Sequence, residues 1–145
     1  MISTLLILKL NKISSTAKIM NSPEARGDII IPNSIIYKSK EYFIDSVDSD
    51  AFKNPLSLFV QNIKKSVDFS QNSQIKMITS DCFDVSIQCI TFPPSLEQFK
   101  FTPEFISLKN ELIFPPNSNC IKYLDSSHEL LVSNYKENNI NSGIL

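Results

Sequence analysis

The chain contains one histidine, His128, which directly follows Ser126 and Ser127. A histidine can act as general base for a serine nucleophile when a third group orients its ring and an oxyanion hole faces the substrate. The sequence offers no pattern that positions such groups, and neighbours along a chain rarely form a triad. We therefore interpret His128 as a surface-loop residue and expect the chain not to be an enzyme.

The candidates for metal binding or redox chemistry are Cys82, Cys89 and Cys120. Zinc sites use closely spaced ligand pairs such as C-x-x-C, and the three cysteines form no such pair. We expect three small buried thiols and no cofactor. A disulfide stays open as an alternative, although no spacing supports one.

Carboxylates gather at Glu41, Asp45, Asp48 and Asp50. A calcium loop of the EF-hand type needs alternating ligands followed by a glycine and a distal glutamate, and no glycine follows these residues. We expect a solvated segment without a metal ion.

Arg26, Gly27 and Asp28 spell a tripeptide that many adhesion ligands use. It stands just before an expected strand, where a turn could expose it. Three-residue motifs also arise by chance, so the alternative is that Gly27 makes a turn and Asp28 leads into the strand.

The composition limits the classes of partner. Fourteen basic and fifteen acidic residues among 145 give a net charge of −1, which provides no electrostatic case for nucleic acid or an anionic membrane. The adjacent pair Lys64–Lys65 is expected to be a solvated surface. Two glycines cannot build a phosphate-binding loop. No segment approaches the roughly 18 apolar residues of a membrane-spanning helix.

An apolar run lies within residues 1–10. No basic residue precedes it and Lys9 interrupts it, so we expect a buried strand rather than a secretory signal.

A repeated phrase provides the strongest structural signal in the sequence. The pattern apolar–x–Phe–Pro–Pro occurs at Ile90–Pro94 and again at Leu112–Pro116. Its apolar–x–apolar core also occurs at Ile29–Ile31 and Val67–Phe69, so the steps from 29 to 67, 90 and 112 are 38, 23 and 22 residues. A fixed period in this range is typical of repeat proteins in which each unit adds one short strand.

A second landmark keeps the same phase. Phe83 precedes Ile90 by 7 residues, and Phe105 precedes Leu112 by 7. Phe52 belongs to the same series if insertions lie around "YKSKEYF" and within "KNPLSLFVQNIKKS". The segments before Phe52 and Phe83 align, with Ile44 on Ile75 and Val47 on Ile78, and are expected to be bent return segments. The next unit, with Leu96, Phe99 and Phe105, is drifted by one residue.

These patterns predict a mostly β repeat solenoid of about four turns, with short parallel strands and few helices. Alternating strand residues would form apolar ladders inside, while Asp68, Thr91 and Ile113 would point outward. Proline after a strand would end its ladder. The expected core residues are Ile29, Ile31, Ile44, Val47, Phe52, Val67, Phe69, Ile75, Ile78, Phe83, Ile90, Phe92, Phe105, Leu112 and Phe114.

The segments "IIIPNSIIYKSKEYFIDSVDSDAF", "SQIKMITSDCFDVSIQCITFPPSLEQF" and "LIFPPNSNCIKYLDSSHELLV" resemble the leucine-rich repeats of BspA-like surface antigens. The resemblance covers Asp28 to Val132 and implies a right-handed solenoid with a role in adhesion or protein binding. It also suggests the cell surface, although the sequence itself leaves the compartment unknown. Ser70 and Cys82 depart from the proline and alanine of that repeat.

The sequence divides into three parts. Residues 1–27 are an N-terminal flank, a degenerate repeat or a cap; residues 28–132 are the repeat array; residues 133–145 are a polar tail that we expect to fray. A hairpin of Ile121–Leu124 and Leu130–Val132 would cover the last strand edge. The predicted function is a binding module for a protein or cell-surface macromolecule, through the exposed β face. The alternative is a truncated structural remnant without a ligand.

Overall fold

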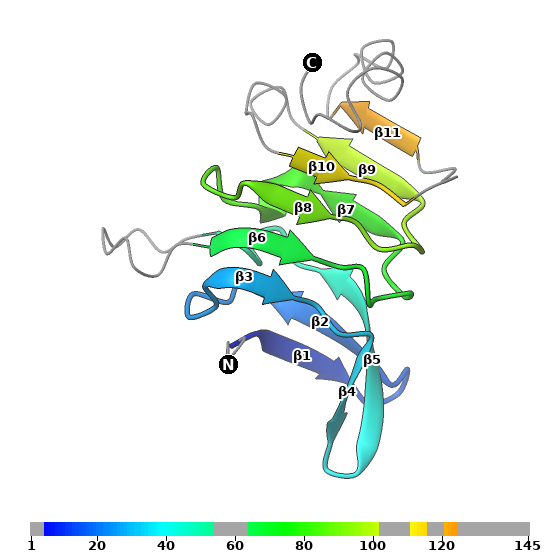
Figure 1. The fold of residues 1–145 in the computed structure, drawn as a ribbon. Helices are drawn as coiled ribbons and strands as arrows, with labels where there is room; N and C mark the ends of the chain where they lie inside the picture. The colour runs from blue at the N-terminus through cyan, green and yellow to red at the C-terminus, as the bar shows by residue number, and fades with distance from the viewer. Residues whose placement is uncertain (1–4, 54–63, 102–110, 116–120, 125–145) are drawn as a thin grey trace.

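The fold, seen in a computed structural model, is built from short β-strands (Figure 1). The structure describes residues 5–53, 64–101, 111–115 and 121–124, of which the last four are described by backbone alone. A short 3-10 helix, η2 (Ser80–Cys82), is the helical element of these residues. The strands are β1 (Ile7–Asn11), β2 (Thr16–Met20), β3 (Gly27–Ile30), β4 (Ser34–Tyr37), β5 (Lys40–Val47), β6 (Lys64–Asp68), β7 (Met77–Thr79), β8 (Cys89–Thr91), β9 (Gln98–Phe101), β10 (Glu111–Ile113) and β11 (Ile121–Leu124).

The front sheet consists of β3, β6, β8 and β10, which are hydrogen-bonded in that order and all parallel. Ile29 pairs with Val67, Val67 with Ile90, and Ile90 with Leu112. The expectation that these four residues lie side by side on adjacent parallel strands is therefore confirmed. Steps of 38, 23 and 22 residues therefore place the equivalent apolar residues of successive repeats beside one another on neighbouring strands.

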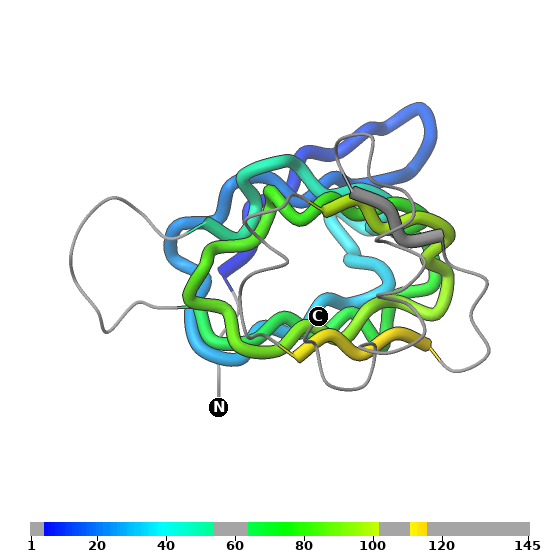
Figure 2. Tube along the Cα trace, turned by 90° about the horizontal axis from the view of Figure 1, so that it is seen from above, coloured from blue at the N-terminus to red at the C-terminus, as the bar shows by residue number. Residues whose placement is uncertain are grey.

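The back sheet consists of β7, β9 and β11, which are also parallel. From β6 onward the strands alternate between the two sheets, so each passage of the chain adds one front and one back strand (Figure 1 and Figure 2). The return segments, which were expected only to be bent, each carry a short strand of their own. Ile78 pairs with Phe99 in this sheet.

The N-terminal sheet consists of β1, β2, β5 and β4, in that order. β2 and β5 are parallel, while β1 and β4 pair antiparallel with their neighbours. The expected insertion around "YKSKEYF" is the hairpin of β4 and β5, which projects from the body in Figure 1. The expectation of a buried first strand was wrong: β1 is an edge strand, and Ile7 is half exposed while Leu8 packs against the core.

The core lies between the sheets and is rich in phenylalanine. Phe52 and Phe83 stack with ring centroids 5.6 Å apart and form an isolated parallel bridge. Phe92 stacks on Phe114 at 4.4 Å. Fully burying one such side chain contributes on the order of 2 kcal/mol. Of the expected core residues, those that are buried are Ile29, Ile31, Ile44, Phe52, Val67, Phe69, Ile75, Ile78, Phe83, Ile90, Phe92, Leu112 and Phe114; Val47 is partly buried.

Asn72, in the loop between β6 and β7, joins three segments of the molecule and is fully buried. Its Nδ2 donates to the carbonyl oxygens of Ile44, at 2.8 Å, and Pro32, at 3.1 Å. Its Oδ1 accepts from the backbone N–H groups of Gln74 and Ile75, both at 2.9 Å. A fully satisfied buried amide fixes the loop without the cost of an unpaired polar group.

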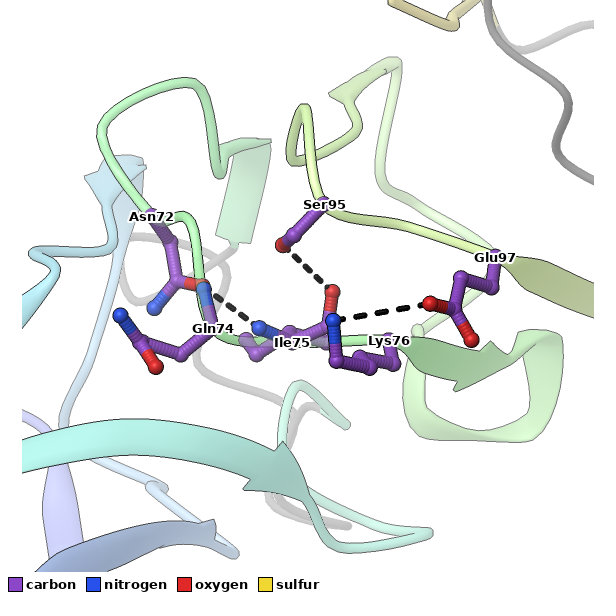
Figure 3. A network of polar contacts seen from close by, with 6 residues as sticks. All are labelled: Asn72, Gln74, Ile75, Lys76, Ser95 and Glu97. Atoms are coloured by element: carbon purple, nitrogen blue, oxygen red, sulfur yellow. Dashed lines mark hydrogen bonds and ion pairs between the residues drawn. The ribbon is translucent and has the colours of Figure 1, made fainter.

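The same loop is tied to the next passage of the chain (Figure 3). The Ser95 hydroxyl donates to the Ile75 carbonyl oxygen at 2.7 Å, and Lys76 and Glu97 form an exposed ion pair at 3.5 Å. The backbone N–H groups of Glu97 and Gln98 also donate to the Lys76 carbonyl. These bonds set the spacing of successive turns at the edge where front strands lead into back strands.

Several predicted features lie outside the described residues. They are Phe105, Cys120, Ser126, Ser127, His128, residues 54–63 of the insertion expected within residues 53–66, and the tail 133–145. The first half of the expected C-terminal hairpin is a strand, β11, but it pairs parallel with β9 and continues the back sheet. Its expected hairpin partner, Leu130–Val132, is also outside the described residues. The proposed divisions at residues 27 and 132 stay predictions.

Candidate interaction face

The outer face of the front sheet presents two rows of side chains from four strands. The strand pairing aligns Asp28, Ser66, Cys89 and Glu111 in one row. It aligns Ile30, Asp68, Thr91 and Ile113 in the other. All eight side chains are exposed or half-buried, whereas the residues between the rows are buried. Parallel pairing in register therefore turns four distant segments into one continuous surface, the front face.

The front face is acidic with apolar ends. Asp28, Asp68 and Glu111 place three carboxylates within it. Ile30 is 48% exposed at one end of its row and Ile113 is 40% exposed at the other. Exposed isoleucines beside carboxylates give a surface with both apolar and charged contacts to offer a partner.

Ser70, which stands where the other repeats have proline, is hydrogen-bonded to the Asp68 side chain. The Ser70 backbone N–H donates to Asp68 Oδ1 at 2.8 Å. Proline has no N–H and could not make this bond. In the repeats with Pro32, Pro93 and Pro115, the residue two positions earlier is isoleucine or threonine rather than aspartate. The departure from the repeat thus fixes the carboxylate on the front face.

Gly27 and Asp28 of the tripeptide begin the edge strand β3, and Arg26 directly precedes it. Gly27 has φ +68°, in the left-handed region that glycine adopts without steric cost. Asp28 Oδ1 accepts a hydrogen bond from the Ser66 hydroxyl at 2.8 Å, which holds the carboxylate against the next strand. The structure thus places Asp28 in the front face; an adhesive role for the tripeptide stays a prediction.

The two described cysteines differ in environment. Both are free thiols. Cys82 is buried, and burial raises the pKa of its thiol well above the usual value. Cys89 is half-buried on the front face, where desolvation and then the neighbouring Glu111 carboxylate raise its thiol pKa. The expectation of buried thiols therefore fails for Cys89, and both thiols stay protonated at neutral pH, which makes them poor nucleophiles.

Lys64 contradicts the expectation of a solvated lysine pair. Its side chain is fully buried at the start of β6, whereas Lys65 is exposed. Burial lowers the pKa of the Lys64 ammonium, and the charges of Asp84 and Glu24 act in the opposite direction. The pairing of β3 and β6 shifts register between Gly27 and Asp28, from Lys64 to Ser66, and passes over Lys65. Sequence alternation alone could not reveal this irregularity.

Two of the carboxylates of residues 41–50, Glu41 and Asp48, have partners on different segments. Glu41 accepts a hydrogen bond from Ser34 at 2.6 Å, and Asp48 lies 3.6 Å from the Lys18 ammonium. Across the described ranges, no group of three or more His, Cys, Asp or Glu residues is arranged to hold a metal ion. Within the same ranges, no helix has the length and hydrophobicity needed to cross a bilayer.

No family model matches the sequence, and no curated protein matches it significantly. Among solved structures, the chain is similar to a leucine-rich repeat protein from Bacteroides ovatus, with 15% sequence identity and a TM-score of 0.46. That similarity covers 86% of this chain and 37% of the other, so the chain spans little more than a third of that protein.

Proposed function

We propose that the chain is a short leucine-rich-repeat solenoid of the BspA-like kind, and that it binds a protein through its front face. The observation that carries this proposal is the register of the front sheet, which aligns eight outward side chains in two rows. Stacked repeats produce extended surfaces of this type, and such surfaces commonly serve binding. An adhesive role at the cell surface would follow from the same resemblance.

The chemistry of the front face supports a particular class of partner. Asp28, Asp68 and Glu111 favour a partner surface with lysine or arginine side chains, because complementary charge speeds encounter and fixes orientation. Ile30 and Ile113 would then meet apolar side chains at the two ends of the contact. Flat sheets of short strands suit a folded protein surface better than a small molecule, which requires a concave site.

The experiment compares binding by the full chain and by variants with reversed charge. Asp68→Lys should weaken binding of the captured partner by about tenfold or more, because like charges would meet across the contact. Glu97→Lys makes the same change of charge at an exposed residue of the edge where front strands lead into back strands, outside the front face, and should leave binding unchanged. Surface plasmon resonance measures both affinities, and thermal unfolding checks that both variants fold.

Two outcomes would contradict the proposal. Equal affinity of the wild type and Asp68→Lys would remove the front face from the contact. Failure to capture any partner from an extracellular or a cellular protein pool would favour the alternative of a truncated array with no ligand of its own.

A further inference from the structure

An open depression of about 560 Å³ lies on the N-terminal sheet, over β1, the following turn, β2 and β5. Its lining includes Lys9, Lys12 and Lys18, together with Asp45 and Ser46. The depression belongs to a different sheet from the front face, so it is independent of the protein-binding proposal. Its unusual feature is the concentration of positive charge in a chain whose net charge is −1.

The positive charge is local because residues 1–23 contain three lysines and no aspartate or glutamate. Lys9 and Lys18 stand directly opposite each other on the antiparallel strands β1 and β2. Like charges at such a position are destabilising. Lys18 lies 3.6 Å from Asp48, but across the described ranges neither Lys9 nor Lys12 has a carboxylate within ion-pair distance. An anion between these lysines would relieve the repulsion that the fold otherwise tolerates.

Hydrogen-bonding groups surround these charges. Asn11 Oδ1 accepts from the backbone N–H groups of Ile13, at 3.0 Å, and Ser14, at 3.2 Å, which stabilises the turn between β1 and β2. Its oxygen is therefore used by the turn, and its Nδ2 is the atom that can donate to a ligand. Asp45 is exposed on the β5 side of the depression and can accept a hydroxyl hydrogen.

We infer that this depression binds a sulfate or phosphate ester of a hydroxyl-bearing molecule such as a sugar. The tetrahedral oxyanion lies between the lysine ammonium groups, where charge-assisted hydrogen bonds are the strongest available. A hydroxyl of the same ligand donates to Asp45. The lining has one carboxylate, Asp45, among three lysines, and Asp48 pairs with Lys18. These carboxylates favour such a mixed ligand over a simple polyanion, which they would repel.

The test titrates the full chain with glucose 6-sulfate, glucose 6-phosphate and plain glucose, followed by NMR chemical-shift changes and isothermal calorimetry. We expect saturable binding of at least one ester, no binding of glucose, and weaker binding as salt is added. Lys9→Gln and Lys12→Gln should each lower affinity about tenfold, since each removes a hydrogen bond to a charged group. Lys76→Gln, which removes a lysine paired with Glu97 outside the depression, is the matched control and should change nothing.

The two esters also separate the possible sources of the anion. The site is supported if both esters bind similarly or if only one of them binds. Binding of only one ester would also show whether sulfated or phosphorylated ligands are the natural class. Equal binding of glucose, affinities insensitive to Lys9→Gln and Lys12→Gln, or no saturable binding of either ester would overturn the inference. Lys9→Gln should keep or raise the melting temperature, because it relieves the repulsion with Lys18, so lost binding could not be attributed to unfolding.

Discussion

The front sheet and the N-terminal sheet differ in how their strands find their partners and their register. In the front sheet, every strand pairs parallel with a segment more than twenty residues away, and the register comes from the repeated sequence. In the N-terminal sheet, β1 pairs with β2 and β4 with β5 through short turns, so the register of these two pairs comes from local geometry, and the parallel pair of β2 and β5 joins the two hairpins. Parallel strands cannot be joined by a two-residue turn, which is why the repeat needs a return passage through the back sheet.

The two sheets also differ in charge. The front face carries Asp28, Asp68 and Glu111, whereas the charged side chains of residues 1–23 are all positive: Lys9, Lys12 and Lys18. A net charge near zero thus hides two surfaces of opposite sign. The net charge of −1 describes the whole molecule, but it does not reveal the charge of any one surface.

The largest expected difference between the regions concerns core packing. Phe92→Ala should destabilise the protein by about 3–5 kcal/mol, because Phe92 is buried against Phe99 and Phe114 and its removal leaves a cavity. Leu8→Ala in the edge strand should cost about 1 kcal/mol, because Leu8 is only partly buried. Urea unfolding followed by circular dichroism measures both. Comparable losses would mean that the N-terminal sheet is as much a part of the cooperative core as the stacked repeats.

The strands of the front sheet could be predicted from the sequence, whereas the short strands of the back sheet could not. Ile29, Val67, Ile90 and Leu112 could be aligned from the amino-acid pattern alone because each repeat places an apolar residue at the same rung. The short back strands were missed because three or four residues within an arc show too little alternation to be distinguished from a bend.

Other features depend on contacts that no local pattern encodes. The burial of Lys64 follows from a register irregularity beside Gly27, and the role of Asn72 follows from carbonyl groups on two distant segments. The front face could be expected from the repeat, since Asp68, Thr91 and Ile113 alternate with core residues. The lysine depression could not, because it depends on how Lys9 and Lys18 pair across a hairpin.

The next largest effect is expected at Asn72, which connects the two regions. Asn72→Ala should cost about 2–3 kcal/mol, because it leaves the Ile44 and Pro32 carbonyls and the N–H groups of Gln74 and Ile75 without this partner. Asn72→Asp keeps the shape but points a carboxylate at two carbonyl oxygens, and should destabilise at least as much at neutral pH. Asn33→Ala, which removes exposed bonds to Ser73, is the control and should cost under about 1 kcal/mol. Chemical denaturation measures all three, and equal effects at Asn33 and Asn72 would show that burial is irrelevant here.

Backbone conformation gives a pair of predictions with opposite signs. Gly27, at the start of the front sheet, has φ +68°, and a Cβ there would meet no atom within 4 Å, so Gly27→Ala should cost about 1 kcal/mol through backbone strain alone. In the N-terminal sheet, Ser39 has φ +65° in the turn between β4 and β5, and Ser39→Gly should recover up to about 1 kcal/mol. Thermal unfolding of the two variants should shift the midpoint in opposite directions. A fall in both midpoints would mean that chain entropy, rather than strain, controls the hairpin turn.

The smallest effect concerns the lysines that face each other across β1 and β2. Lys9→Glu converts the repulsion with Lys18 into an attraction and should stabilise the protein by about 0.5 kcal/mol at low salt. Lys65→Glu makes the same change of charge on an exposed residue of the acidic front sheet and should be neutral or slightly destabilising, since it adds to the charge of Asp28, Asp68 and Glu111. Because both effects are electrostatic and exposed, they should shrink together as salt is added. Unfolding midpoints measured at low and high salt test this prediction. If the stabilisation by Lys9→Glu persists in high salt, it must come from packing or strand propensity. The lysines on β1 and β2 would then have no repulsion for an anion to relieve.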